Sequence, residues 1–265
     1  MELLHPAVLQ PLYVVSGLLV GVLVGLTGVG GGSLMTPLLI LFFGIHPSTA
    51  VGTDLLYAAV TKTVGTTVHH AGKSIEWKIV GLLAMGSVPA TGLVILALSH
   101  FGSASPGVSK AISLTLGVAL LISAVLLVLK GPIVKAATTR NPDFGLHTSA
   151  SLTVLTGFVV GALVSLSSVG AGALGTIALM FLYPRLPTVK IVGTDIAHAV
   201  PLTLLAGLGH WWLGSINVGL LGSLLAGSIP GILIGSYAAR FTPEIALRPA
   251  LAAVLALVGI KMLAG

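Results

Sequence analysis

The sequence predicts an all-α polytopic membrane protein made of two inverted homologous repeats, each with a broken helical hairpin plus three transmembrane helices. Three observations support this fold class: the apolar composition, an internal repeat, and basic residues gathered on one side of the membrane. Of the 265 residues, 55% are hydrophobic and only 7% are charged. A soluble domain carries roughly 25% charged residues, so most of this exterior must face lipid.

The apolar segments have the length of membrane-spanning helices. They run to about 20 residues, which a hydrocarbon core of roughly 30 Å requires at 1.5 Å per residue. Strands of an outer-membrane barrel would be alternating segments of about 10 residues, so the sequence predicts helices in the cell inner (plasma) membrane. The chain has no cysteine, which excludes disulfides and thiolate metal sites. The sparse basic residues do not indicate nucleic-acid binding.

An internal repeat relates the two halves of the chain. GVLVGLTGVGGGSL at 21–34 matches GALVSLSSVGAGAL at 161–174, and VGTD at 51–54 recurs at 192–195. The motif GSVP at 86–89 then matches GSIP at 227–230. An ordered match of this length indicates duplication.

Each half is predicted to contain one long interrupted segment followed by three plain spans. In the first half these are 11–44, 50–69, 78–99 and 109–130, and in the second half 149–183, 191–209, 217–239 and 245–264. The predicted domains are therefore a first transmembrane repeat at 1–130, a cytoplasmic linker at 131–148 and a second transmembrane repeat at 149–265.

The distribution of basic residues favours inverted halves. If each interrupted segment enters and leaves the membrane on one face, most basic residues fall on that same side, as cytoplasmic loops require. These residues are Lys73, Lys78, Lys130, Lys135, Arg140, Arg185, Lys190, Arg240 and Arg248. Only Lys110 and Lys261 fall opposite, so both termini are predicted on the non-cytoplasmic side.

Each interruption is predicted to be a turn between two short membrane helices. Glycines cost a helix about 1 kcal/mol each relative to alanine, and the first run holds five between Gly25 and Gly32. Unbonded backbone at this depth must be buried in protein or line a cavity. Paired broken helices in inverted repeats are typical of secondary transporters, which bind substrate near mid-membrane.

Two longer motifs carry a family resemblance. GLTGVGGGSLMTPLL at 25–39 and HPSTAVGTDLL at 46–56, with weaker second copies, resemble the TauE/SafE family of membrane permeases. The resemblance covers nearly the whole chain and implies export of sulfite or small organosulfonates such as sulfoacetate. The second copy departs from the first, because Ala171 and Ala173 stand where the first has Gly31 and Ser33.

The helix starts after the two glycine runs are candidate anion sites, because exposed N–H groups and the positive end of the helix dipole face the ligand there. The alternative is that these glycines serve close helix packing. The candidate substrate-binding residues, including hydroxyl donors, are Thr27, Gly30, Gly31, Gly32, Ser33, Thr53, Lys62, Thr66, Ser168, Gly170, Gly172 and Thr194.

Two carboxylates occupy equivalent positions inside predicted spans. Asp54 and Asp195 each end a VGTD motif, and a carboxylate within the membrane indicates a functional site. They are candidates for coupling a proton or Na⁺ to transport. The alternative is that each stabilises the adjacent broken helix by hydrogen bonding.

Lys62 lies on the same predicted span as Asp54, too far along the helix for a direct pair. It is a candidate countercharge for the substrate, with pairing to another helix or snorkelling to an interface as alternatives. Thr66 is a candidate hydroxyl donor, although threonine commonly bonds its own helix backbone.

The histidines are candidate coupling or gating groups, because histidine titrates near neutrality. His69 and His210 are repeat-equivalent near the ends of their spans, and His198 lies close to Asp195. Their alternative is an interfacial position beside tryptophan anchors. No histidine spacing indicates a metal site.

The leading interpretation is a secondary transporter that exports a small anion, sulfite or a short organosulfonate, by alternating access. The alternative is a proton- or cation-coupled transporter of another small solute that uses Asp54 and Asp195. No GxSxG motif or close carboxylate pair occurs, so we expect no enzyme and no cofactor. The expected partners are a small anionic solute and the lipid bilayer, and a homo-oligomer is left open.

Overall fold

The computed structural model describes residues 10–27, 32–140, 146–238 and 244–264. These residues form ten helices and no strand. The helices are α1 (Pro11–Thr27), α2 (Gly32–Leu41), α3 (Pro47–Ala71), α4 (Trp77–Phe101), α5 (Pro106–Arg140), α6 (Leu146–Ser167), α7 (Ala173–Leu182), α8 (Thr188–Trp212), α9 (Val218–Ala238) and α10 (Glu244–Ala264).

The helices follow the predicted segments closely. Three of them begin with proline, at Pro11, Pro47 and Pro106, because proline fixes a helical φ and the first helical residue needs no N–H donor. Both interrupted segments are divided in two, as predicted, but the first helix of each is long, with 17 residues in α1 and 22 in α6, whereas the sequence predicted two short helices. The largest boundary difference is that α5 continues to Arg140, whereas the sequence placed the end of that span at 130.

The exterior has the character of a lipid-facing surface. Helices α4, α5, α6, α8 and α9 contain stretches long and apolar enough to cross a membrane, and α1, α7 and α10 contain shorter apolar stretches. Many apolar side chains on the outside are more than half exposed, among them Leu19, Leu96, Leu233 and Leu257. The prediction of an all-helical polytopic membrane protein is confirmed.

Helix α3 differs from its neighbours in lying at the centre of the molecule. It carries Asp54, Lys62 and several threonines, and it is the least apolar of the helices in composition. Its residues 51–59 are all buried, and α8, its equivalent in the second half, packs along it. The most polar helix is therefore screened from lipid by the others.

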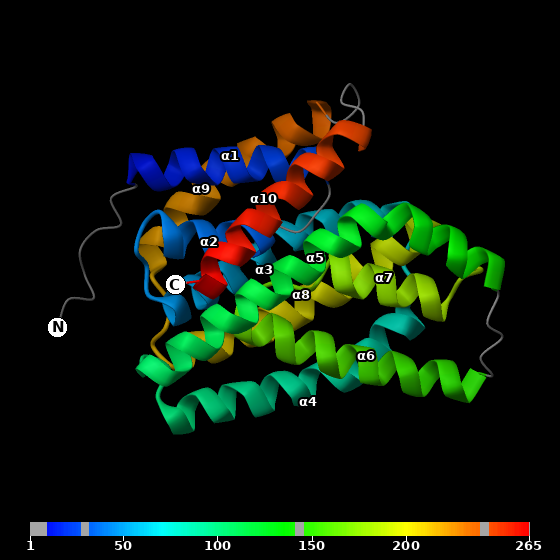
Figure 1. Ribbon diagram of the computed structural model, residues 1–265, viewed down its shortest axis with the longest axis horizontal. Coiled ribbons are helices and arrows are strands. Elements are labelled where there is room, and N and C mark those ends of the chain that lie inside the picture. The colour runs from blue at the N-terminus through cyan, green and yellow to red at the C-terminus, as the bar shows by residue number, and fades with distance from the viewer. Residues whose placement is uncertain (1–9, 28–31, 141–145, 239–243, 265) are drawn as a thin grey trace.

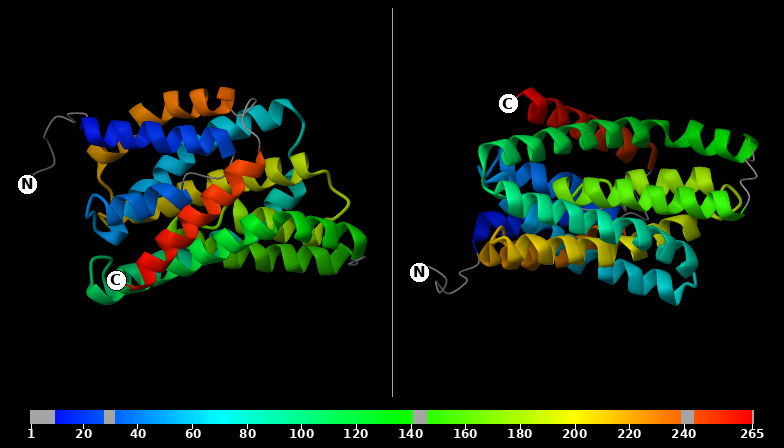
Figure 2. Two further views of the ribbon diagram at one scale, coloured as in Figure 1. Left: turned by 45° about the horizontal axis from the view of Figure 1, so that its top comes forward. Right: turned by 90° about the horizontal axis from the view of Figure 1, so that it is seen from below.

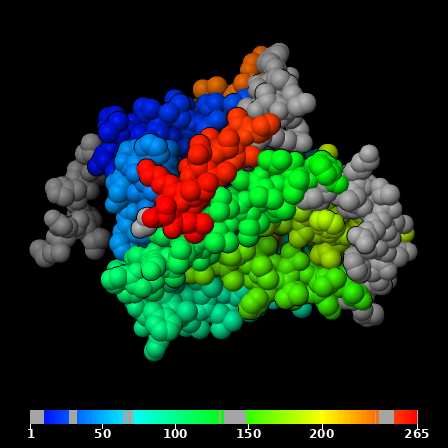
Figure 3. All heavy atoms as spheres, in the orientation of Figure 1, coloured from blue at the N-terminus to red at the C-terminus, as the bar shows by residue number. Residues whose placement is uncertain are grey.

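Helices are exchanged between the two halves. Helix α1 packs along α9 of the second half, and its equivalent α6 packs along α4 of the first half (Figure 1). Helix α10 lies across α5, its own equivalent, on the face seen in Figure 3. Each half thus completes the other, and neither forms a separate bundle.

Glycines allow both exchanged pairs to approach at backbone distance. Two glycines one turn apart on α1 face the backbone of α9, and two equivalent glycines on α6 face that of α4. Small residues at such spacing are the usual basis of close packing in membranes. The contacts join Gly17 to Leu224 and Gly21 to Ser228 in one pair, and Gly157 to Leu83 and Gly161 to Ser87 in the other.

Equivalent helices run in opposite directions along the long axis. Helices α1 and α5 run away from the end where both termini lie, whereas α6 and α10 run toward it (Figure 1). The α3–α4 and α7–α8 connections lie at the opposite end in both further views (Figure 2). The antiparallel course places the charged α3–α4 and α7–α8 turns together, at the end away from the termini.

Candidate functional site

The second helix break is buried, irregular backbone between α6 and α7. Ser168 and Gly170 have φ angles of 59° and 125°, and Gly172, directly before α7, has 128°. Glycine adopts such angles without steric cost, whereas serine is strained there. Ser168, Val169 and Gly170 are buried, so this non-helical backbone is covered by protein, as membrane depth requires.

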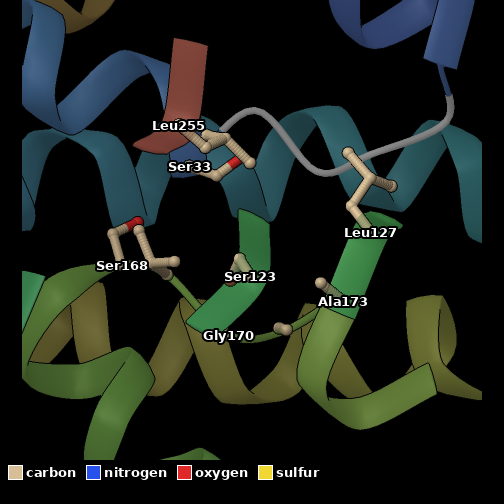
Figure 4. A pocket seen from close by; sticks show the side chains of 9 residues that line it. Ser33, Ser123, Leu127, Ser168, Gly170, Ala173 and Leu255 are labelled. Atoms are coloured by element: carbon tan, nitrogen blue, oxygen red, sulfur yellow. The ribbon is translucent and has the colours of Figure 1, made fainter. Parts of the chain in front are cut away.

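A small cavity lies where this break meets the start of α2. It measures about 20 Å³, which is room for about one water molecule. Three serine hydroxyl groups line it, from α2, α5 and the break (Figure 4). The lining residues are Ser33, Ser123, Leu127, Ser168, Val169, Gly170, Ala171, Ala173 and Leu255.

One of the three hydroxyls is buried without a partner among the described residues, namely Ser123 Oγ. The hydroxyl of Ser168 lies close to the Asp54 carboxylate instead. An unsatisfied buried hydroxyl costs about 1–3 kcal/mol, so a ligand that accepted the O–H group of Ser123 would gain that energy. The third hydroxyl belongs to Ser33, which is 7% exposed and lies in the first turn of α2.

Lys62 connects the first half to the second break. It lies on α3, and its Nζ donates a hydrogen bond to the carbonyl oxygen of Ala171 at 3.2 Å. Ala171 lines the cavity and Lys62 does not, so the ammonium group lies behind the wall, bonded to one of the wall residues. At the equivalent position of the second half, Thr203 is buried and its hydroxyl donates to Ala199 O of its own helix.

Asp54 and Asp195 each fasten the short helix of their own half. Oδ2 of Asp54 accepts a hydrogen bond from Thr36 on α2, and Oδ2 of Asp195 accepts one from Thr176 on α7 at 3.0 Å. The two carboxylates are 0% and 1% exposed. Oδ1 of each has no hydrogen-bond partner among the described residues. Each carboxylate therefore uses only one of its two oxygens to hold the short helix.

Thr53 and Thr194 do not line the cavity and instead join the halves at opposite ends of the molecule. The hydroxyl of Thr53 accepts the amide N–H of Asn217 in the α8–α9 turn at 3.2 Å. The hydroxyl of Thr194 accepts the amide N–H of Glu76 in the α3–α4 turn at 2.9 Å. We call these two contacts the end latches.

The end latches are unequal, because only one of them carries an ion pair. The side chain of Glu76 also pairs with Lys190 on α8. At the Thr53 latch, Asn217 turns its side chain to its own helix and accepts the N–H of Leu220.

Thr66, His198 and His210, which are also candidates, form hydrogen bonds within the protein and do not line the cavity. Thr66 donates to Lys62 O of its own helix. His198 Nε2 and Ser87 Oγ lie 2.9 Å apart, and His210 Nε2 lies 3.0 Å from Ser165 O. Gly32 begins α2, and Gly170 and Gly172 lie in the second break. Gly30, Gly31 and the side chains of Thr27 and His69 lie outside the described residues.

Sequence reasoning missed Ser123 as a cavity residue. It lies within a plain apolar span, where a single serine is usually explained by a bond to its own helix backbone. No pattern in the sequence distinguishes it from the other span serines. Among the described residues there is also no cluster of histidine and acidic side chains that could hold a metal ion.

Comparisons with known proteins agree with this architecture. The family model described as sulfite exporter TauE/SafE matches residues 13–262. A probable membrane transporter protein of Bacillus subtilis (strain 168), YjnA, is 41% identical over 252 residues, covering 94% of this chain and 98% of that protein. A second from the same organism, YdhB, is 29% identical over 249 residues, covering 92% and 96%.

No solved structure matches this chain. The family match and the full-length relatives together confirm the family resemblance carried by the glycine-rich and VGTD motifs. This multi-pass membrane protein is a membrane transporter and belongs to the sulfite exporter TauE/SafE family.

Proposed function

We propose that this protein is a secondary transporter that exports a small anion, sulfite or a short organosulfonate, by alternating access. The observation that carries the proposal is the serine-lined cavity between the start of α2 and the α6–α7 break, with Lys62 bonded to Ala171 of its wall. Hydroxyl donors and a cation are the groups that bind an anion. The family's description as sulfite exporters supports a sulfur oxyanion in particular.

The two short helices add to the attraction for an anion. Ser33 lies in the first turn of α2, and Ala173 is the first residue of α7. Both residues line the cavity, so two helix N-termini with positive dipole ends meet at one place. Convergence of two broken helices at a repeat interface is the arrangement in which secondary transporters bind substrate.

The size of the cavity supports alternating access. At about 20 Å³ it is smaller than an oxyanion with three oxygens, so the surrounding helices must separate before substrate enters. The end latches lie at opposite ends of the paired helices α3 and α8. Opening one latch while the other stays closed would expose the cavity to one side at a time.

A test of the anion site uses a hydroxyl that the fold itself does not need. Ser123→Ala removes a group without a hydrogen-bond partner, so we expect an unchanged melting temperature without ligand. Stabilisation by saturating sulfite or sulfoacetate should fall, with affinity about 10-fold weaker, since one hydrogen bond to an anion contributes roughly 1.5 kcal/mol. The measurement is thermal unfolding of the purified protein across a panel of sulfite, sulfoacetate, thiosulfate and small carboxylates.

The matched control is Ser228→Ala on α9. Ser228 Oγ is also buried without a partner but lies outside the cavity lining. It should therefore leave both unfolding and ligand stabilisation unchanged. Equal ligand stabilisation in Ser123→Ala and wild type would contradict the proposed site, and a panel without any stabilising anion would contradict the substrate class.

We further propose that the repeats are inverted in the inner membrane, with both termini on the non-cytoplasmic side. The natural chain contains no cysteine, so single-cysteine labelling needs no prior substitutions. We expect Lys73→Cys and Arg185→Cys to react with an impermeant maleimide only from the cytoplasmic side, and Lys110→Cys only from the other. All three positions are exposed. Reaction of the first two from opposite sides would exclude inverted halves.

A further inference from the structure

Among the described side chains, the centre of the molecule holds one half-buried cation, Lys62, for two buried carboxylates. Asp54 comes from the first half and Asp195 from the second, and both are almost completely buried. Lys62 has no charged counterpart, since Thr203 occupies its equivalent position. With both carboxylates ionised, the three groups carry a net charge of minus one, which opposes the entry of an anion.

The single cation is shared unequally. Lys62 reaches the second break, where its Nζ donates to Ala171 O, and Asp195 is hydrogen-bonded to Thr176 on α7, the helix that begins two residues after Ala171. The ammonium group therefore lies on the side of the second-half carboxylate, and its attraction to Asp195 exceeds that to Asp54. Asp54 is the less compensated carboxylate, with hydroxyl groups of Thr36 and Ser168 as its near neighbours.

The less compensated carboxylate adjoins the cavity. Ser168 lines the cavity, and its hydroxyl lies close to the Asp54 carboxylate. An anion beside Ser168 would therefore lie near an ionised Asp54. Like charges that share one low-dielectric site repel each other strongly. Anion binding and an ionised Asp54 thus strongly disfavour each other.

Asp54 has a position where a proton can bind without disturbing the fold. Thr36 donates to Oδ2, whereas Oδ1 is buried without a partner. A proton on Oδ1 would remove the negative charge and leave the Thr36 bond, which holds α2, intact. It would also turn the unsatisfied acceptor into an O–H donor.

We propose that the anion binds and crosses together with one proton, carried on Oδ1 of Asp54. The inference rests on the proposed function, because it takes the serine-lined cavity to be the anion site. A monovalent anion and its proton carry no net charge together, so their transport is electroneutral. Asp195 stays ionised as the partner of Lys62. Net flux follows the sum of the anion and pH gradients, so export requires an outward anion gradient larger than any inward proton gradient.

Other titratable groups near this pair lie outside the cavity lining. On α3, the Tyr57 hydroxyl is buried without a partner among the described residues. On α8, Nε2 of His198 bonds Ser87 and Nε2 of His210 bonds the carbonyl oxygen of Ser165, and neither histidine lines the cavity. Lys110 on α5 and Tyr237 on α9 are exposed, and α2 has no titratable side chain. Within the described part of the helices that pack on α3, Asp54 is thus the group best placed to take the proton.

The test uses the full-length protein in liposomes and methanesulfonate as probe, because a sulfonate keeps its charge across the neutral pH range. A pH gradient without membrane potential should drive accumulation, about tenfold per pH unit at one proton per anion. A valinomycin-imposed potassium potential without a pH gradient should drive none. A trapped pH indicator should report one proton per anion.

A variant identifies the proton-carrying group. In Asp54→Asn, the amide oxygen can still accept from Thr36, so exchange of internal for external methanesulfonate should continue. Its net flux should no longer respond to pH and should respond to membrane potential instead. The control is Lys110→Thr, which changes an exposed charged residue outside the cavity lining and should keep one proton per anion.

The outcomes separate the two proposals. Flux of methanesulfonate driven by potential, without proton movement, would overturn the coupling and leave anion transport standing. Asp54→Asn that still accumulates methanesulfonate down a pH gradient would overturn Asp54 as the carrier. Absence of both methanesulfonate and sulfite flux in the wild type would overturn anion transport itself. The wild-type measurements decide the coupling even if the variant does not fold.

Discussion

Replacing Lys62 by threonine is expected to abolish sulfite transport by proteoliposomes at ordinary substrate concentrations. Lys62 is the cation nearest the cavity, half-buried with its Nζ on Ala171 O of the cavity wall. Removing the cation from a charge pair with a bound anion costs about 3 kcal/mol, which corresponds to roughly 100-fold in affinity. Threonine is the conservative choice, because Thr203 fills the equivalent position in the second half.

The control for Lys62 is Lys110→Thr on α5, which removes an exposed lysine outside the anion cavity. It should transport sulfite at the wild-type rate. Size-exclusion profiles of both variants separate loss of transport from loss of fold. Wild-type transport by a correctly folded Lys62→Thr protein would contradict the assignment of Lys62 to the anion site.

Adding a single methyl group at Gly227 is expected to destabilise the protein strongly. A Cβ at Gly227 would lie 1.8 Å from the carbonyl oxygen of Val14 on α1. Backbone cannot move aside as a side chain can, so α1 and α9 must separate. We expect Gly227→Ala to cost about 3 kcal/mol and to lower the melting temperature by roughly 10 °C.

The exchanged helix pair of the other half should respond in the same way. A Cβ at Gly86 on α4 would lie 1.9 Å from Val154 O on α6. Gly222 on α9 has nothing within 4 Å of its Cβ position, so Gly222→Ala should leave the melting temperature unchanged or raise it slightly. Equal melting temperatures for Gly227→Ala and Gly222→Ala, by thermal unfolding, would contradict the backbone contact between α1 and α9.

The structure bears on the role of Asp54 and Asp195. The sequence made these carboxylates candidates either for coupling an ion to transport or for stabilising a broken helix, and each accepts a hydrogen bond from a threonine one turn into the short helix of its half. The same residues keep an unsatisfied Oδ1. The two roles are therefore compatible, because different oxygens of one carboxylate serve them.

Sequence reasoning found the polar residues that stand out from an apolar background. Asp54, Asp195 and Lys62 are conspicuous inside spans, and Ser168 and Gly172 lie within a repeat motif. It had no means of selecting Ser123, because serine is common in membrane helices. Which side of the helix faces a cavity is decided by the neighbouring helices. It also assigned Thr53 and Thr194 to the substrate, whereas the structure places their hydroxyls at turns of the opposite half.

The sequence by itself determined the all-helical membrane class, the family, the positions of the breaks and the buried charges. Hydrophobicity and local backbone chemistry decide these properties, and both can be read along the chain. Only the tertiary structure decided that α1 pairs with α9 and α6 with α4, and that Lys62 reaches the second break. Helices that are apolar on all sides do not specify which neighbour they contact, so partner choice emerges from packing.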